Sequence, residues 1–167
     1  ILMNFFDCFK PDIVYKSVID VPFDELKAKG KSCVLLDFDN TIGPDRALEP
    51  DDYSFRCINL LREKGFDCCI VSNAKSTRSA HIAEVLGVPC VTCAKKPGTK
   101  GVKNALNMMK VDAKRAVMIG DQIFTDIFAG RKSGIYTIMV EKYQQNEIWY
   151  VAIKRPFERI IRFFGGF

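Results

Sequence analysis

The chain has 167 residues, of which 48% are hydrophobic and 27% charged, and it carries a net charge of +5. This length suits a single domain with its own core, and the mixed composition excludes a disordered, fibrous or repetitive protein. The positive charge favours anionic partners in general, without choosing among phosphate esters, nucleic acid and anionic lipid.

Five apolar, β-branched runs predict strands over residues 32–38, 67–71, 88–92, 116–119 and 135–140. Segments with helical periodicity lie between them, over 51–63, 77–86, 99–109 and 123–132. Strands that alternate with helices predict an α/β fold with a doubly wound, mainly parallel five-stranded sheet and helices on both faces. The near-continuous apolar strands fit burial on both sides.

The whole chain, 1–167, is expected to form one domain. Residues 1–31 are predicted to be an N-terminal extension that packs on the core, and residues 144–167 a C-terminal helical segment. No apolar run approaches the roughly 20 residues that span a bilayer, and the first residues do not resemble a signal peptide.

Cysteine usage predicts a reducing compartment. Most of the seven cysteines lie in apolar segments, where buried thiols are common. Cys90 and Cys93 have CxxC spacing without a second pair or a nearby histidine, so a zinc or redox role is not expected. We expect a cytoplasmic protein, including one in peripheral contact with the membrane, or a mitochondrial matrix protein in a eukaryote.

Two carboxylates, Asp37 and Asp39, follow the apolar run 34–36. The period of a β-strand predicts that they leave on the same side, and an irregular turn at the strand's carboxyl end can separate their roles. Such a pair must either repel or share a cation.

Further polar residues follow the later strands: Ser72 and Asn73, then Lys96, then Asp121 and Asp126. Each alone is explained equally well as a helix cap, a turn residue or a solvated side chain. Their recurrence at four strand ends favours a shared site, because the carboxyl ends of parallel strands meet at one edge of a sheet. Carboxylate oxygens at that edge predict a hard cation, and Mg²⁺ with a substrate phosphate fits best.

In order and spacing, these residues resemble the four motifs of the haloacid dehalogenase-like phosphatases. The motifs in this chain are Asp37-Phe-Asp39-Asn-Thr41, Ser72-Asn73, Lys96-Pro97 and Gly120-Asp121-xxx-Thr125-Asp126. The residues Lys10-Pro-Asp12 and Val14 to Val18, together with the motifs at 39–42 and 120–126, narrow the resemblance to the capless subfamily IIIA, which includes the phosphatidylglycerophosphate phosphatases and their bacterial relatives.

The resemblance implies a catalytic mechanism. Asp37 is expected to be the nucleophile that forms an aspartyl-phosphate, Asp39 the general acid and base, and Lys96 a cation over the phosphoryl group and the nucleophile. It also implies Mg²⁺ held by the Asp37 carboxylate, the Asp39 backbone carbonyl and Asp121. Asp126 is expected to support the site rather than to bind the metal.

The same resemblance implies the substrate contacts. Thr41 is expected to position the loop, while the Ser72 hydroxyl and the Asn73 backbone donate to phosphate oxygens. Further basic residues near these motifs are Arg46, Lys75, Arg78 and Lys95. Of these, we expect Arg46 and Lys75 to contact a second phosphate on the substrate.

No cap domain fits between these motifs, because one helix fills each gap. The site is therefore expected to be open to a phosphate on a large molecule or a membrane, unless an oligomer partner covers it. The leading hypothesis is dephosphorylation of phosphatidylglycerophosphate to phosphatidylglycerol. The alternatives are a phosphatase for phosphoprotein or nucleic-acid phosphate ends and a receiver-like switch without turnover. No base-stacking aromatic platform accompanies the basic residues, so a nucleic-acid partner is not expected.

The C-terminal segment has the pattern of a short basic amphipathic helix. Its apolar face holds Phe157, Ile160, Ile161 and Phe164, and its basic face holds Arg155, Arg159 and Arg162. The apolar face can pack on the sheet or contact a membrane, and the sequence leaves both open.

Overall fold

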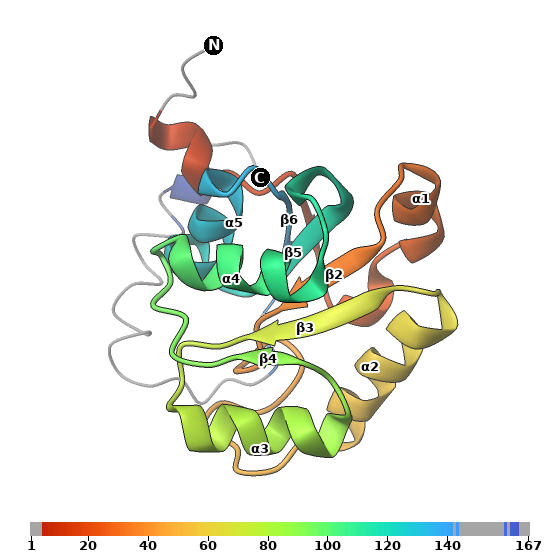
Figure 1. The fold of residues 1–167 in the computed structure, drawn as a ribbon. Helices are drawn as coiled ribbons and strands as arrows, with labels where there is room; N and C mark the ends of the chain where they lie inside the picture. Colours follow the sequence, from red (N-terminus) through yellow and green to blue (C-terminus); the bar gives the residue numbers. More distant parts are fainter. Residues whose placement is uncertain (1–4, 142, 144–158, 160, 164–167) are drawn as a thin grey trace.

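The computed structural model describes residues 5–141, 143, 159 and 161–163. They form a parallel six-stranded sheet in the order β1-β6-β5-β2-β3-β4, with helices on both faces (Figure 1). The strands are β1 (Ile13–Tyr15), β2 (Cys33–Leu36), β3 (Asp67–Val71), β4 (Cys90–Val91), β5 (Ala116–Gly120) and β6 (Tyr136–Val140). The predicted α/β, doubly wound class is confirmed.

Five α-helices join these strands: α1 (Phe23–Ala28), α2 (Asp52–Glu63), α3 (Ser76–Leu86), α4 (Lys100–Met109) and α5 (Phe128–Lys132). Short 3-10 turns are η1 (Phe5–Phe9), η2 (Val18–Asp20) and η3 (Ala113–Arg115), and a π-helical turn, η4 (Ile123–Ile127), leads into α5. One helix lies between β2 and β3 and one between β3 and β4, so within residues 5–141 no cap domain is inserted.

The core explains why the strands read as continuous apolar runs. In β2, Val34 and Leu36 face the cluster that contains the buried residues of α1, α2 and α3. Cys33 and Leu35 face the opposite cluster, with α4 and Ala129 of α5. Because both faces are covered by helices, every position of the strand is buried.

Local signals set the helix ends close to the predicted positions. At the start of α2, Asp51 accepts a hydrogen bond from the Ser54 N–H at 3.0 Å, and the Ser54 hydroxyl accepts one from the Asp51 N–H, forming a capping box. At the end of α3, Gly87 has a φ of 66°, a left-handed conformation that favours glycine.

The structure corrects several sequence predictions. The sheet has six strands rather than five, because β1 pairs in parallel with β6 at the sheet edge. Its three residues are not fully buried and give no long apolar run. Strand β4 has two residues instead of the predicted five, and β2 ends at Leu36, before the first carboxylate.

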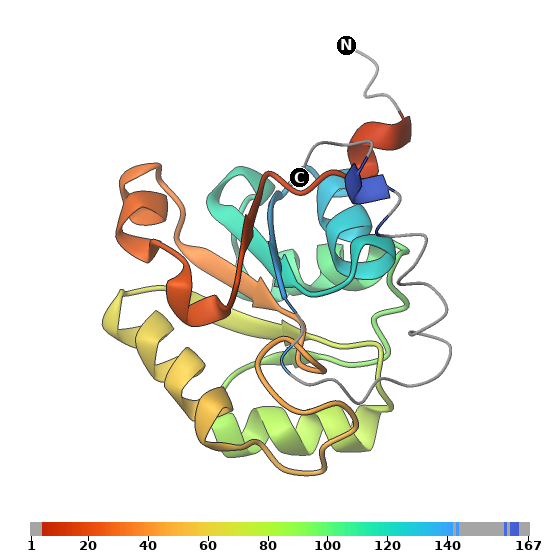
Figure 2. The ribbon, with the colours of Figure 1, turned by 180° about the vertical axis from the view of Figure 1, so that it is seen from behind.

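Residues from both ends of the chain lie side by side. Figure 2 shows the described C-terminal residues (blue) beside η1 (red). Ile161 packs against a cluster that contains Phe9 of η1, Ile123, Ile127 and Met139. The other residues of the predicted apolar face, Phe157, Ile160 and Phe164, lie outside the described residues, as does Arg155. No helix in the described ranges is long and apolar enough to cross a bilayer.

Candidate active site

The loop after β2 is built around one carbonyl group. The Phe38 carbonyl accepts hydrogen bonds of 3.1 Å from the three successive N–H groups of residues 41–43. Asn40 adopts a positive φ of 59°, and Gly43 is required because a Cβ atom there would lie 2.3 Å from the Phe38 ring. This tight turn ends the strand geometry, so residues two apart need not face the same way.

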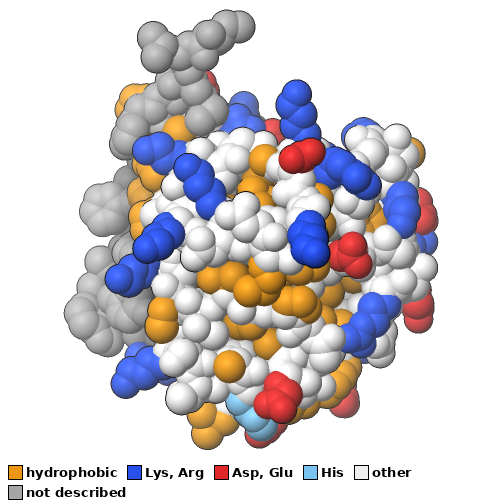
Figure 3. Space-filling model, viewed as in Figure 1, with side chains coloured by type: hydrophobic (Ala, Val, Ile, Leu, Met, Phe, Trp, Pro, Cys, Tyr) orange, Lys and Arg blue, Asp and Glu red, His pale blue; other side chains and the backbone are white. Residues whose placement is uncertain are grey.

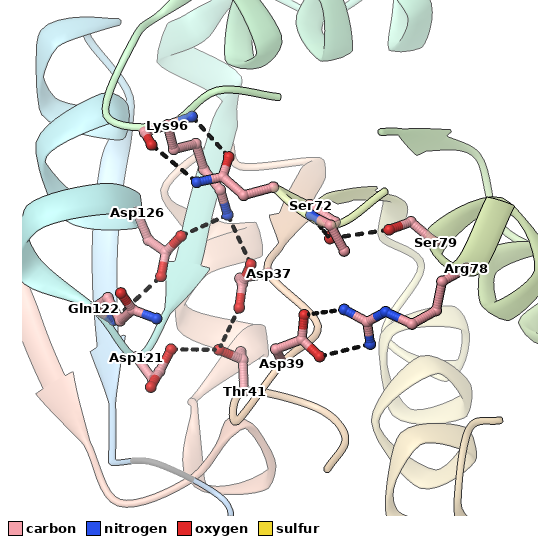
Figure 4. A network of polar contacts seen from close by, with 12 residues as sticks. Asp37, Asp39, Thr41, Ser72, Arg78, Ser79, Lys96, Asp121, Gln122 and Asp126 are labelled. Atoms are coloured by element: carbon pink, nitrogen blue, oxygen red, sulfur yellow. Dashed lines mark hydrogen bonds and ion pairs between the residues drawn. The ribbon is translucent and has the colours of Figure 1, made fainter. Parts of the chain in front are cut away.

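Three carboxylates gather at the carboxyl edge of the sheet. Each of Asp37, Asp121 and Asp126 offers an oxygen atom within 4.8 Å of the other two, and all three are buried. The Lys96 ammonium lies between two of them, 2.7 Å from Asp37 Oδ1 and 2.6 Å from Asp126 Oδ1 (Figure 4). One ammonium does not neutralise three carboxylates, so the cluster attracts further positive charge.

The pKa values reflect this imbalance. Burial raises the pKa of Asp37 well above its usual value; Lys96 opposes the increase, and the carboxylates of Asp126 and Asp121 add to it. Burial alone would lower the pKa of Lys96, but the charges of Asp126 and Asp37 outweigh it and raise that pKa. Lys96 therefore stays charged, and a proton or a cation relieves the repulsion among the acids.

The donor atoms suit a hard divalent cation. The Thr41 hydroxyl lies 3.4 Å from Asp37 Oδ2 and 3.5 Å from Asp121 Oδ1, so these two oxygens face a common region. Asp126 is occupied on both oxygens, by Lys96 and by the Gln122 N–H at 3.2 Å. Carboxylate oxygens from two residues, completed by waters and a phosphate, are a typical Mg²⁺ environment. Because Asp126 also offers an oxygen to the cluster, its role as a support rather than a metal ligand stays a prediction.

Gly120 allows Asp126 to approach the end of β5. A Cβ atom on Gly120 would lie 2.3 Å from Asp126 Oδ2, so any side chain there would displace that carboxylate. The π-helical turn η4 carries Asp126 back over the strand end, and such turns are frequent at functional sites. Gly120 was not among the predicted site residues, although its place immediately before Asp121 was a signal.

Asn73 holds the loop that carries Lys96. The Asn73 side chain donates to the Lys96 carbonyl at 2.9 Å and accepts from the Lys96 N–H at 2.7 Å. This paired bond is a role that the sequence analysis did not predict. The Ser72 hydroxyl is buried and accepts hydrogen bonds from the Ala74 N–H and the Ser79 hydroxyl. Phosphate contacts of residues 72 and 73 stay predictions.

Asp39 points away from the buried cluster, so the expectation that it leaves on the same side as Asp37 is wrong. Its carboxylate forms a two-pronged ion pair with Arg78 of α3, at 2.8 and 2.6 Å, and accepts the Arg46 N–H at 3.0 Å (Figure 4). The turn around Phe38 produces this divergence. Arg78 was one of the basic residues noted near the motifs, but its ion pair with Asp39 was not predicted.

The two predicted substrate-contacting cations lie at the rim. The side chains of Arg46 and Lys75 are exposed, and Arg46 contacts Asp39 through its main-chain N–H. Lys75 lies at the N-terminal cap of α3. Their contact with a substrate stays a prediction, as does the Asp39 carbonyl as a metal ligand.

Comparisons with known proteins agree with this geometry. A family model described as haloacid dehalogenase-like hydrolase matches residues 14–134. A Bacillus subtilis (strain 168) protein named probable phosphatase YqeG is 28% identical over 153 residues, which cover 92% of this chain and 89% of that protein.

Two solved structures share the fold. A protein from Listeria monocytogenes serotype 4b has a TM-score of 0.57 and 17% identity, over 70% of this chain and 84% of that chain. A hydrolase of the same superfamily from Ehrlichia chaffeensis has a TM-score of 0.55 and 17% identity, over 80% of this chain and 98% of that chain.

Proposed function

The chain belongs to the haloacid dehalogenase-like hydrolase family and is a phosphatase enzyme, and on this premise we propose that it is an Mg²⁺-dependent phosphomonoesterase acting through an aspartyl-phosphate. Its proposed substrate is phosphatidylglycerophosphate, which it converts to phosphatidylglycerol. The observation that carries the proposal is the buried Asp37 carboxylate, paired with Lys96 on one oxygen and facing Asp121 with the other.

This arrangement suits nucleophilic attack on a phosphate. A phosphomonoester carries about two negative charges, so a carboxylate can approach it only where cationic groups neutralise the phosphoryl oxygens. Lys96 supplies one fixed positive charge beside Asp37. A Mg²⁺ held by Asp37 and Asp121 would supply the Lewis acid that polarises the phosphoryl group.

The protein groups then divide the work. Asp37 attacks phosphorus, and the leaving oxygen takes a proton from Asp39. In the second half of the reaction Asp39 removes a proton from the water that hydrolyses the aspartyl-phosphate. Thr41 holds the nucleophile's loop through its hydroxyl, and Asn73 fixes Lys96 through the paired backbone contacts.

The choice of substrate rests on access and charge. Without a cap over the described part of the site, a phosphate that projects from a large molecule or from a membrane can reach Asp37. Lysine and arginine side chains spread over much of the face seen in Figure 3, in keeping with the net charge of +5. A positive surface favours an anionic lipid layer. We therefore propose peripheral contact with a membrane from the cytoplasmic or matrix side.

The test is phosphate release from a panel of substrates, measured with Mg²⁺ and with EDTA. The panel contains vesicles with phosphatidylglycerophosphate, phosphopeptides and oligonucleotides with terminal phosphates. We expect Mg²⁺-dependent release, highest from the vesicles, and its loss in Asp37→Asn. Faster release from phosphopeptides or oligonucleotides would overturn the lipid assignment. Stoichiometric labelling of Asp37 without turnover would overturn the enzyme in favour of a phospho-switch.

A further inference from the structure

Arg78 connects the proposed acid and base to the rim of the site. We propose that Arg78 is a positioning residue that holds Asp39 away from the nucleophile in the empty enzyme and exchanges it for a second anionic group on the substrate. The enzyme would thereby select phosphomonoesters that carry another negative charge close to the scissile phosphate. This inference rests on the proposed phosphatase function and deepens it by naming the substrate class.

The ion pair immobilises the Asp39 carboxylate. Arg78 Nη1 donates to Asp39 Oδ1 at 2.8 Å and Nη2 donates to Oδ2 at 2.6 Å, which is the parallel geometry of a strong guanidinium–carboxylate pair. The Arg46 N–H adds a third hydrogen bond at 3.0 Å. Both oxygens of Asp39 thus accept hydrogen bonds, and the ion pair holds the carboxylate toward Arg78 rather than toward Asp37 (Figure 4).

Arg78 has an anchor that does not depend on Asp39. Its Nη1 also donates to the Ala47 carbonyl at 3.0 Å, which ties the guanidinium to the loop that follows the nucleophile. A guanidinium has five N–H donors, and three of these have acceptors among residues 5–141. We therefore expect the Ala47 contact to keep the guanidinium in place when Asp39 turns away, which frees the two N–H donors that had contacted Asp39.

Partial burial makes the exchange selective. The side chains of Arg78 and Asp39 are 18% and 22% exposed, so water only partly replaces a lost partner. If the pair opens for a substrate that lacks a second anionic group, the guanidinium charge is left without a counter-ion. A carboxylate or phosphodiester on the substrate restores the two-pronged contact, so release of Asp39 is coupled to binding of the correct ligand.

The exchange is also consistent with the position of α3. Arg78 is the third residue of α3, which begins at Ser76, so it lies shortly after Ser72 and Asn73 of the proposed phosphate-binding segment. In Figure 4 the guanidinium and Asp39 lie on the α3 side of the loop, and Asp37 with Lys96 on the other side. A substrate that reaches Asp37 with one phosphate can present its second anion to Arg78.

The test uses two small substrates that differ by one charge. Glycerol 3-phosphate and 3-phosphoglycerate share the scissile phosphate and backbone, and only the second carries a carboxylate. For the unmodified full chain with Mg²⁺ at low salt, we expect kcat/KM to be about tenfold higher for 3-phosphoglycerate, as one charge-assisted contact predicts. In Arg78→Gln this ratio should fall to about one.

Two further variants keep the test decisive. Arg56→Gln removes an exposed arginine from α2 and should keep the tenfold ratio, which controls for loss of general positive charge. Arg78→Lys keeps the charge without the two-pronged geometry and should give an intermediate ratio; it replaces Arg78→Gln if that variant does not fold. The proposal would be overturned if the ratio of kcat/KM values were the same in the wild type and in both Arg78 variants. It would also be overturned if the wild type did not prefer 3-phosphoglycerate.

Binding separates this proposal from the phosphatase proposal. If the wild type hydrolyses neither compound nor the vesicles, the proposed function fails, and calorimetry with Asp37→Asn decides the role of Arg78. We expect 3-phosphoglycerate to bind that variant about tenfold more tightly than glycerol 3-phosphate. Adding Arg78→Gln should abolish the difference, and equal affinities before that change would overturn the proposal.

Discussion

Two carboxylates in one loop have opposite environments. Asp37 is paired with Lys96, and their side chains are 11% and 1% exposed. Asp39, two residues later, is paired with Arg78, and those side chains are 22% and 18% exposed. The first pair lies within a buried cluster that includes Asp126, whereas the second faces the rim.

The difference in burial lets two neighbouring acids take different roles: one holds the catalytic geometry and the other responds to the substrate. Breaking a buried ion pair costs much free energy, because no solvent replaces the partner of the remaining charge. Breaking a partly exposed pair costs less, because water can solvate both groups in part. The inner pair can therefore hold a nucleophile and a metal site in one geometry. The outer pair, Asp39 and Arg78, can exchange partners when a substrate arrives. The rigid catalytic geometry and the selection of the substrate therefore lie on opposite sides of the same turn.

Removing the inner acid should have the largest effect. We expect Asp37→Asn to lower phosphate release by at least about 10⁴-fold, because the nucleophile is lost. In EDTA the variant should melt no lower than the wild type, since burial raises the pKa of Asp37 and its charge is unfavourable in the empty cluster. Phosphate release and thermal melting measure both quantities.

The matched control is Asp112→Asn, which changes an exposed carboxylate that makes no side-chain cap contact. Its activity and melting temperature should equal those of the wild type. Turnover of Asp37→Asn within tenfold of the wild type would show that another group is the nucleophile.

Removing the inner cation tests the rigidity directly. Lys96→Met leaves Asp37 and Asp126 without their shared ammonium, and we expect a loss of about 3–5 kcal/mol in the free energy of unfolding. Urea denaturation in EDTA measures it. Lys103→Met, an exposed lysine on α4, should change that free energy by less than about 0.5 kcal/mol. Similar small losses for both variants would contradict a structural role of the buried pair.

The pH dependence of the stability of the metal-free protein should come from the buried cluster around Asp37. Because the pKa of Asp37 is raised in the folded state, its contribution to stability is complete below its unfolded pKa and is lost as the pH rises through the folded pKa. In EDTA, the melting temperature should therefore fall as the pH rises from the unfolded pKa of Asp37 through its folded pKa. Saturating Mg²⁺ at about 100 times its Kd should restore about 2.7 kcal/mol at neutral pH. An equal Mg²⁺ effect in Asp121→Asn would place the ion elsewhere.

The framework of the fold was predictable because its signals are local. The capping box at Asp51 and Ser54 and the left-handed Gly87 set helix ends that the sequence patterns located. Strand β1 was missed because its three partly exposed residues gain their place only by pairing with β6, a contact between distant parts of the chain.

The sequence predicted which residues form the candidate site better than it predicted where their side chains point. Spacing and strand ends brought Asp37, Lys96 and Asp121 into one set, and the structure brings them together. The turn around Phe38 sends Asp39 the other way, and a strand-period argument does not apply after β2 ends at Leu36. The pairing of that acid with a helix residue depends on tertiary packing.

The outer pair should contribute least to stability. In a double-mutant cycle of Asp39→Ala and Arg78→Ala, measured by urea denaturation, we expect a coupling free energy of about 1 kcal/mol or less, because both side chains are partly exposed. The cycle cancels the separate loss of the Ala47 contact, which Arg78→Ala removes whether or not Asp39 is present. A coupling of 3 kcal/mol or more, the size that a buried pair gives, would make this pair as fixed as the inner one. A substrate anion could not then displace Asp39, and the selection proposed for Arg78 would lose its physical basis.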